Sequence, residues 1–282
     1  MTADSAGPLL EVEDLNVTFD TRSGPVHAVR NVSFSLGREK LGIVGESGSG
    51  KSQTGRALLG LTPYPGRVEA RQLCFDGRDL LGMSPRQMRE VRGKRISMVM
   101  QDPKYSLNPV MTVGKQIAEA YRGHGRANRS EARESTLEML SAVKIRSPQR
   151  VYDAYPHEVS GGMGQRIMIA MMLITDPDLL IADEPTSALD VTVQLQVLAV
   201  LDDLVSDRGM GLIFISHDLA LVASFCDRIL VMYGGRVMEE LQASRLHEAR
   251  HPYTKGLLAC LPEIDGHHDV LPILERDPQW LA

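Results

Sequence analysis

Cysteine is scarce in this chain, and the few that occur are far apart. Cys74, Cys226 and Cys260 form no CxxC pair, which argues against a disulfide framework or a cysteine metal site and favours a reducing compartment. Long apolar runs are missing too, because no stretch approaches the roughly 18 residues that a membrane-spanning helix needs. The first ten residues, MTADSAGPLL, do not resemble a secretion signal. We therefore expect a soluble chain that reaches a membrane only through a partner.

An excess of positive charge is absent as well. The formal net charge of -5 argues against a dedicated nucleic-acid binder, which usually carries a basic excess. The hydrophobic content of 43% and the charged content of 24% are ordinary for a globular protein. At 282 residues the chain is long enough to bury a large core, as one α/β domain or as one domain with an added lobe.

The hydrophobic pattern predicts strands of two kinds. Residues 11–36 alternate polar and apolar positions, which predicts short half-buried strands joined by a turn. LGIV at 41–44 is a compact apolar run, typical of a buried parallel strand. From residue 178 onward, apolar runs alternate with helical patterns near 191–207 and 218–225, which indicates parallel βαβ units.

Two further helices are predicted between these regions. Residues 84–95 carry many basic side chains and a proline near their start, as in a surface helix. Ser130 is the expected N-cap of a helix that runs to about Val143, with glutamates in its first turn. Beyond about residue 264 the chain is polar, and we expect a loosely packed tail.

A glycine-rich segment carries the strongest functional signal. GESGSGKS at 45–52 fits the pattern G-x-x-x-x-G-K-[ST] and follows the predicted strand at 41–44. Glycines let successive backbone N–H groups point toward phosphate oxygens at the positive end of the next helix. Lys51 would then reach the β and γ phosphates, and Ser52 would bind Mg²⁺. The alternative is a chance glycine-rich turn before a helix.

Three other strand ends carry polar side chains suited to nucleotide chemistry. Asp183 and Glu184 end the apolar run at 178–182, where Asp183 suits a magnesium shell and Glu184 could activate water. His217 follows another strand as a γ-phosphate sensor, and Gln101 could contact both Mg²⁺ and water. Taken singly, each has a plainer interpretation: a solvated turn, a surface or N-cap histidine, and a simple strand exit.

Together the segments resemble those of the ATP-binding subunits of ABC transporters. The chain contains the Walker A, Q-loop, signature, Walker B, D-loop and H-loop motifs of that family, in the family's order over roughly residues 10–263. They read GESGSGKS, MVMQDP, VSGGM, LLIADEP, SALD and FISHD. The resemblance implies a P-loop NTPase (RecA-like) α/β core with a parallel sheet, an N-terminal antiparallel β subdomain and an inserted α-helical subdomain. It predicts an ATP-binding domain at 8–260, with the helical subdomain at about 102–170, and a tail at 261–282.

The family's roles can be transferred residue by residue. Catalytic roles fall to Glu184, His217 and Gln101, and magnesium ligands to Ser52, Gln101 and Asp183. The resemblance implies a bound nucleotide at Phe19, Gly45, Glu46, Ser47, Gly48, Ser49, Gly50, Lys51, Ser52, Ser160, Gly161, Gly162, Met163 and Asp190. For Phe19, which would stack on adenine, a core strand phenylalanine is the alternative.

The signature VSGGM at 159–163 contains no acid or base. In the family this turn faces the ATP that is held by a second ATPase subunit. Bare N–H groups, the Ser160 hydroxyl and the positive end of a helix from about Gln165 would bind the γ-phosphate without any proton transfer. Asp190 would link the two composite sites. The cofactors implied are ATP and Mg²⁺.

Longer segments resemble the dipeptide, oligopeptide and nickel importer branch. They include YPHEVSGGM at 155–163 and HPYTKGLLACLPE at 251–263. The branch implies a second, different ATPase, two membrane permeases and an extracytoplasmic solute-binding protein, with this subunit at the cytoplasmic face of the membrane. Many relatives carry a cysteine-rich iron–sulfur segment near the C-terminus, and this chain shows no such cysteines, so we expect no cluster.

Other functions remain open at this stage. Uptake of nickel or a metallophore is an alternative to uptake of peptides. A chromosome-maintenance ATPase would need long coiled coils between the Q-loop and the signature, and the 102–159 segment shows no sustained heptads. A translation factor of this class would carry twin cassettes, whereas one is present here.

Overall fold

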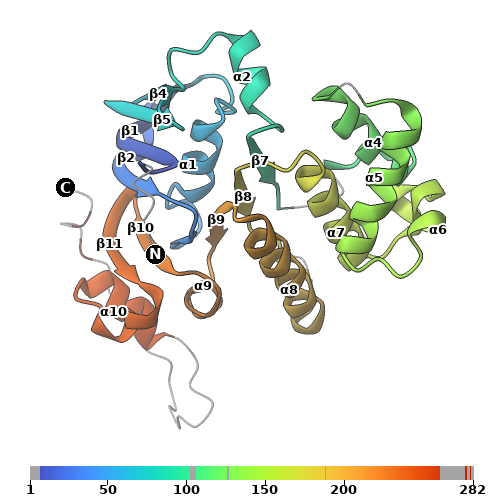
Figure 1. Ribbon diagram of the computed structural model, residues 1–282. Helices are drawn as coiled ribbons and strands as arrows, with labels where there is room; N and C mark the ends of the chain where they lie inside the picture. Colours follow the sequence, from blue (N-terminus) through green and yellow to red (C-terminus); the bar gives the residue numbers. More distant parts are fainter. Residues whose placement is uncertain are drawn as a thin grey trace, which may run out of the picture. The chain divides into compact units, whose positions relative to one another are not determined.

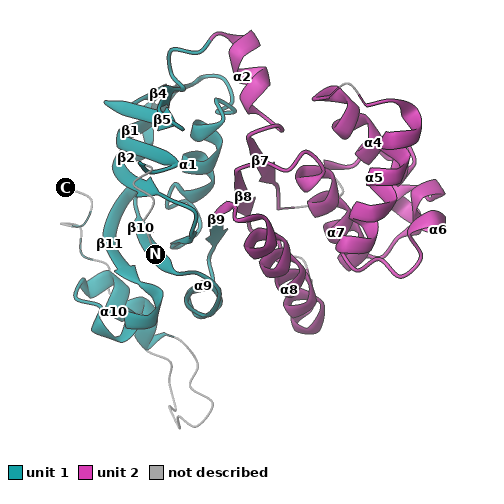
Figure 2. Ribbon diagram, viewed as in Figure 1, with its two compact units in different colours: residues 1–83, 213–282 teal, residues 84–212 magenta. Residues whose placement is uncertain are grey.

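The computed structural model describes residues 7–101, 106–125, 127–187, 189–260, 277 and 280. The chain divides into two compact units, which are coloured separately in Figure 2. The first unit comprises Met1–Met83 and Ile213–Ala282, and the second comprises Ser84–Leu212. Most of the predicted tail at 261–282 lies outside the described residues, and the predicted domain limits stay predictions.

The first unit contains an antiparallel sheet built from the predicted alternating segment. Its order is β2-β1-β5-β6, and β4 also pairs with β1. Leu10, Val12, Leu15 and Val17 of β1 are buried. The period of two expected for a strand with one face in the core changes phase between Val12 and Leu15, where the pairing is irregular and Asp14 has φ +51°. The strands are β1 (Leu10–Thr21), β2 (Gly24–Leu36), β4 (Gly66–Glu69), β5 (Gln72–Phe75) and β6 (Arg78–Asp79).

The first unit also contains most of a second group of strands, in the order β11-β10-β3-β9. They are β3 (Lys40–Val44), β9 (Gly211–Ser216), β10 (Arg228–Tyr233) and β11 (Arg236–Gln242). β10 pairs with β3 in parallel, with Arg228 opposite Leu41, whereas β11 pairs with β10 antiparallel. The antiparallel hairpin differs from the purely parallel pattern predicted beyond residue 178, because the Gly234–Gly235 turn reverses the chain directly.

The described residues of the first unit also form four helices of three residues or more. They are α1 (Lys51–Leu58), α9 (Leu219–Phe225), α10 (Pro252–Ala259) and the 3₁₀ helix η2 (Ala243–Glu248). α1 packs against β1 and β2, and α9 packs against β3 (Figure 1). Gly42 permits that last contact, because a Cβ there would lie 2.1 Å from Cγ1 of Val222.

The second unit pairs two parallel strands with a group of helices. β7 (Ile96–Val99) and β8 (Leu179–Asp183) run in parallel, with Ile96 opposite Leu179. The helices α4 to α7 pack on one another (Figure 1). The helices described in this unit include α2 (Pro85–Val91), α4 (Val113–Gly123), α5 (Arg129–Ala142), α6 (Pro148–Asp153), η1 (Pro156–Glu158), α7 (Gly161–Leu173) and α8 (Val191–Arg208).

Helix starts follow local capping chemistry, with one correction. α2 begins at a capping box formed by Ser84 and Gln87, as a basic surface helix with Pro85 in its first turn. The predicted N-cap at Ser130 is wrong, since Asn128 caps α5 and accepts hydrogen bonds from the N–H groups of Ser130 and Glu131. Asparagine is as good an N-cap as serine, so the sequence offered two competing starts.

Within the described part of the chain, every helix is too short or too polar to cross a lipid bilayer.

Candidate functional site

The segment 45–52 forms a tight loop between β3 and α1 in the first unit. Gly50 is the N-cap of α1 and has φ +99°, and Gly48 has φ +82°, a backbone region that disfavours side chains. At Gly45 a Cβ would lie 2.1 Å from the carbonyl oxygen of Met232. The glycines therefore allow a backbone path that larger residues would block.

Lys51 lies inside this loop and is only 5% exposed. Its ammonium donates hydrogen bonds to the carbonyl oxygens of Gly45, at 2.7 Å, and Glu46, at 2.8 Å. It also contacts Oγ of Ser49 at 3.4 Å. The ammonium of Lys51 thus lies at the centre of the loop, and a positive charge at a buried position attracts anions more strongly than one in water.

Two contacts from other elements hold the loop in place. The carbonyl of Ser49 accepts a hydrogen bond from the N–H of Gly235 at 3.1 Å. The N–H of Glu46 donates to the hydroxyl of Tyr253 at 3.3 Å. Ser47 and Gly48 are exposed, whereas Ser52 is half-buried in the first turn of α1. Reasoning from the sequence missed Tyr253, because nothing in the loop's own residues indicates a contact with α10.

Phe19 and His217 are the other predicted site residues of the first unit. Phe19 is half-buried on β1, where it pairs with Val26 and Gly66. It is therefore not a fully buried core phenylalanine. His217 is exposed directly after β9. The N-cap of α9 is the next residue, Asp218, which accepts from the N–H of Leu221 at 2.9 Å, so His217 does not cap that helix.

In the second unit the structure brings Gln101 and Glu184 together. Nε2 of Gln101 donates to Oε2 of Glu184 at 2.9 Å, although the residues are 83 positions apart. Glu184 has φ +47°, an uncommon conformation for a non-glycine residue that costs on the order of 1 kcal/mol or more and is frequent at functional sites. Asp183, at the end of β8, is 4% exposed. The buried carboxylate of Asp183 is thus followed in the chain by the half-buried carboxylate of Glu184, which is hydrogen-bonded to Gln101.

The signature segment starts α7. Ser160 is its N-cap, and Oγ of Ser160 accepts from the N–H of Met163 at 3.4 Å. The predicted start near Gln165 is wrong, since Gly161 and Gly162 form the first helical turn. Glycine has a low helix propensity, so this turn depends on the hydrogen bond that the N-cap hydroxyl of Ser160 accepts. Ser160 and Gly161 are exposed, so the N-terminal end of α7 is accessible.

α8 supports the signature turn. A Cβ on Gly162 would lie 2.3 Å from Cγ1 of Val193, so the two helices meet at a glycine. Asp190, the predicted D-loop residue, is exposed and caps α8 by accepting from the N–H of Val193 at 3.0 Å. Asp190 therefore has a structural role within its own chain.

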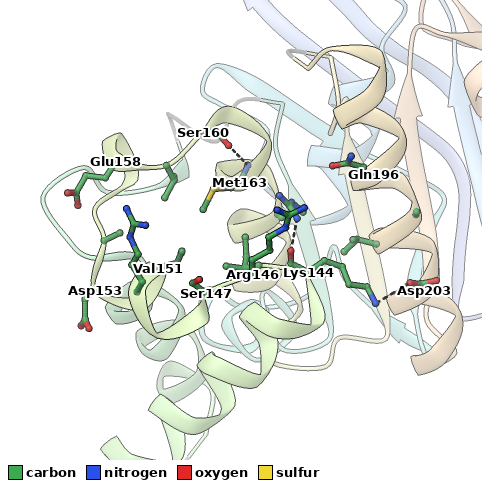
Figure 3. Close-up of a pocket in the computed structure, with 17 residues that line it drawn as sticks. Lys144, Arg146, Ser147, Val151, Asp153, Glu158, Ser160, Met163, Gln196 and Asp203 are labelled. Carbon is green, nitrogen blue, oxygen red and sulfur yellow. Dashed lines mark hydrogen bonds and ion pairs between the residues drawn. The ribbon is translucent and has the colours of Figure 1, made fainter.

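Arg166 is a residue of the signature helix that the sequence did not single out. It donates to the carbonyl oxygens of Gly162 at 3.2 Å and Lys144 at 2.8 Å, which joins the signature turn to the segment after α5. Burial lowers the pKa of Arg166, and the nearby charge of Arg146 lowers it further. Lys144, Arg146 and Arg166 line a cavity of about 910 Å³, together with Ser160 and Met163 (Figure 3).

The predicted residues thus fall into two sets. The phosphate loop, Phe19 and His217 belong to the first unit, and Gln101, Asp183, Glu184, Asp190 and the signature turn belong to the second. A P-loop nucleotide enzyme needs a glycine loop with a lysine and carboxylates at a strand end. The first set supplies the loop and its buried lysine, and the second set supplies the carboxylates. The class defined by this fold and these groups is the P-loop NTPases.

Comparisons with known proteins identify the family within that class. Residues 29–187 match the family described as ABC transporter. The chain is 50% identical over 258 residues, which are 90% of this chain and 77% of the relative, to a probable peptide ABC transporter ATP-binding protein of Sinorhizobium fredii. It is 47% identical over 261 residues, or 92% of this chain and 73% of the relative, to an oligopeptide transport ATP-binding protein of Bacillus subtilis.

A solved structure agrees with these relatives. A bacterial ABC transporter cassette, described as dimeric, superposes with a TM-score of 0.72 at 26% identity, covering 83% of this chain and 98% of that one. The chain belongs to the ABC transporter family and is an ABC ATPase. The predicted family, enzyme class and fold class are confirmed.

Proposed function

We propose that this chain is the ATP-binding and ATP-hydrolysing subunit of an importer that takes up peptides through partner permeases. The observation that carries the proposal is the buried Lys51 within a glycine loop whose carbonyls hold its ammonium. The solute class comes from the relatives, whose names describe peptide and oligopeptide transport at 50% and 47% identity. The predicted uptake of peptides is thus a proposal for this chain, supported by likeness to those proteins.

The phosphate loop fits a nucleoside triphosphate. Lys51 would neutralise the β and γ phosphates, and the N–H groups of Gly48, Ser49 and Gly50 would bind phosphate oxygens at the start of α1. The space that a Cβ would fill at Gly45 is already occupied by the carbonyl of Met232, so the fit needs glycine there. Glu46, Ser47 and Ser52 complete the loop, and Phe19, which is half-buried on β1, would stack on the base.

A magnesium ion fits the oxygen-donor residues at hand. Within the second unit, Asp183 and Gln101 offer carboxylate and amide oxygens, and within the first unit Ser52 offers a hydroxyl oxygen; oxygen donors of these kinds are the ligands that Mg²⁺ prefers. When bound, the ion would draw charge from the phosphate oxygens. Asp183 is 4% exposed, and a carboxylate so deeply buried is well matched to a cation.

Hydrolysis would rest on Glu184. Its carboxylate would orient and deprotonate the attacking water, while the amide of Gln101 keeps one of its oxygens engaged at 2.9 Å. His217, exposed at the end of β9, would sense the γ-phosphate by hydrogen bonding. Hydrogen-bond donors such as His217 and Lys51 would stabilise the negative charge that develops on the phosphoryl oxygens.

The signature turn would act on a nucleotide held by a second subunit. Ser160, Gly161, Gly162 and Met163 form the exposed or half-buried first turn of a 13-residue helix, and such a turn attracts phosphate through its N–H groups and its dipole. The partner would be a second, different ABC ATPase, and Asp190 would lie at the interface between the two sites. A monomer would then hydrolyse ATP poorly.

The wider assembly follows from the importer branch. The proposed partners are two membrane permeases and, through them, an extracytoplasmic solute-binding protein, with this subunit at the cytoplasmic face of the membrane. Nickel or metallophore uptake is the second candidate, because that branch shares the 251–263 segment. A DNA-maintenance role is disfavoured by the short helices described between the Q-loop and the signature, among which α5 has 14 residues.

Reconstitution tests the proposal directly. The chain would be co-expressed with the ATPase and permeases encoded beside it, purified as a complex and placed in proteoliposomes with the matching binding protein. We expect ATP-dependent uptake of a labelled peptide, which a complex carrying Glu184→Gln fails to perform. Uptake of Ni²⁺ without peptide uptake would favour the second candidate. Recovery of the chain with ribosomes or DNA, and never with permeases, would contradict both.

A further inference from the structure

Tyr253 occupies an unusual position for a tyrosine outside the recognised motifs. It lies in the first turn of α10, within the segment HPYT at 251–254, and is fully buried. Its ring packs on Tyr233, at the end of β10, with the centroids 4.7 Å apart. A buried tyrosine hydroxyl normally requires a hydrogen-bond partner, and the identity of that partner shows what the residue does.

The partner is the phosphate loop. The hydroxyl of Tyr253 accepts a hydrogen bond from the N–H of Glu46 at 3.3 Å. Glu46 is the second residue of the glycine loop, and its carbonyl in turn accepts from the ammonium of Lys51 at 2.8 Å. Glu46 therefore connects the two side chains: its N–H bonds to Tyr253, and its carbonyl oxygen bonds to Lys51, the lysine that would bind phosphate.

The residues around Tyr253 fix its position. Nδ1 of His251 accepts from the N–H of Tyr253 at 3.1 Å and caps α10. The carboxylate of Glu239, on β11, accepts from the N–H groups of Arg250 at 2.6 Å and His251 at 3.2 Å. The start of α10 is thus tied to β11 by charge-assisted hydrogen bonds, which are stronger than neutral ones.

The chain's single tryptophan covers this arrangement from the far end of the sequence. The ring of Trp280 lies 5.8 Å from that of Tyr253, 5.9 Å from that of Tyr233 and 5.8 Å from that of His251, centroid to centroid. Edge-to-face contacts at such distances are favourable. We call these four residues the aromatic cluster.

We propose that Tyr253 is a positioning residue for the phosphate loop, held in place by the aromatic cluster. The inference rests on the proposed ATP-binding role of the loop and gives the HPYT segment a physical task. With the Tyr253 hydroxyl at Glu46 and the Gly235 N–H at Ser49, the loop is fixed at two points before any nucleotide arrives. A loop that is already ordered loses less conformational freedom on binding and so binds more tightly.

The test compares two tyrosine variants of the full chain. Tyr253→Phe removes the acceptor and keeps the ring. Tyr233→Phe is the matched control, because in the described structure the Tyr233 hydroxyl makes no hydrogen bond while its ring contributes equally to the cluster. The Kd of a fluorescent ATP analogue, excited directly, would be measured for both variants, the wild type and Lys51→Ala, with thermal unfolding followed in parallel.

We expect Tyr253→Phe to raise the Kd about three- to tenfold, the effect of losing one hydrogen bond, and Tyr233→Phe to leave it within about twofold. In the coupled ATPase assay the KM should rise with the Kd while kcat changes little. Equal binding by Tyr253→Phe and wild type, or equal weakening in both phenylalanine variants, would overturn the inference. If the wild type binds no better than Lys51→Ala, the proposed function itself fails.

Discussion

The side-chain amide of Gln101 donates a hydrogen bond to the carboxylate of Glu184, with nitrogen and oxygen 2.9 Å apart. Gln101 follows β7 and Glu184 follows β8, and these two strands are parallel neighbours, so their carboxyl ends meet at one edge. Glu184 has φ +47°, a conformation that is uncommon for a residue other than glycine. The carboxylate is therefore held in one orientation without nucleotide, which favours a role in chemistry over a role in folding.

Replacement of Glu184 by glutamine should separate binding from hydrolysis. Glu184→Gln preserves the size of the side chain but cannot accept a proton, so hydrolysis should fall about 10²- to 10⁴-fold, while ATP binds with near-normal affinity. Phosphate release and nucleotide Kd would be measured on the same preparation. Glu119→Gln, on the exposed surface of α4, is the control. Near-normal turnover in Glu184→Gln would remove this residue from its proposed role.

Replacement of Lys51 by alanine should act on binding itself. The variant loses the ammonium that lies among the carbonyls of the loop, and those carbonyls would then repel phosphate. We expect the ATP Kd to rise at least tenfold, as for loss of a buried charge contact. Lys115→Ala removes an exposed lysine and should bind as wild type does. An unchanged Kd in Lys51→Ala would contradict the phosphate-loop assignment.

The sequence predicted those features that depend on short stretches of chain. The strand, the glycine loop and the helix lie within the 19 residues from Lys40 to Leu58, and the φ angles and N–H groups of the loop are local properties. The carboxylates after β8 were found in the same way, from an apolar run that ends in acids. Order of motifs supplied the family, and the comparisons confirm it.

The features that the sequence missed depend on contacts between distant segments. The tie between Tyr253 and Glu46 spans 207 positions, and the pair Gln101–Glu184 spans 83, so no local pattern marks either. Arg166 looked like one more polar residue in a helix, yet it bonds back to Lys144. The start of α7 was placed too late because glycine is a poor helix former, and the cap from Ser160 outweighs that preference.

Substitution by alanine should change the stability of the protein differently at the two signature glycines. A Cβ at Gly162 would lie 2.3 Å from Cγ1 of Val193, whereas one at Gly161 would meet its nearest atom, in Leu189, at 3.8 Å. Gly162→Ala should lower the free energy of unfolding by about 1 to 3 kcal/mol, the usual cost of overpacking. Gly161→Ala should be neutral or slightly stabilising, since alanine is the better helix former.

A second substitution checks the cause of that difference. Val193→Ala removes the atom that the new methyl group would strike, so the double variant Gly162→Ala/Val193→Ala should recover stability relative to Gly162→Ala alone. Urea denaturation of the four proteins forms a double-mutant cycle. Additive losses would show that the contact between α7 and α8 does not set the need for glycine at 162.

The thiol of Cys226 should be the least reactive of the three in this chain. Burial raises its pKa to about 12; Lys40 acts to lower that value and Asp227 to raise it. Cys74 and Cys260 are only partly buried. In a Cys74→Ser/Cys260→Ser variant, a thiol reagent at pH 8 should label the folded protein far more slowly than the denatured chain, because a protonated thiol is a poor nucleophile. Rapid labelling of the folded variant would contradict the burial.

The same shift predicts how stability depends on pH. In the unfolded chain the Cys226 thiol ionises near its ordinary pKa of about 8.5, whereas in the folded chain it stays protonated until about 12. Its contribution to stability is therefore complete below pH 8 and declines as the pH rises from about 8.5 toward 12. At pH 10 the free energy of unfolding should have lost about 1 to 2 kcal/mol from this group. Urea titrations of wild type and Cys226→Ala at pH 7.5 and pH 10 isolate that loss, because alanine has no proton to release. A wild type that declines no more steeply than Cys226→Ala would show that the buried thiol does not set the alkaline limit.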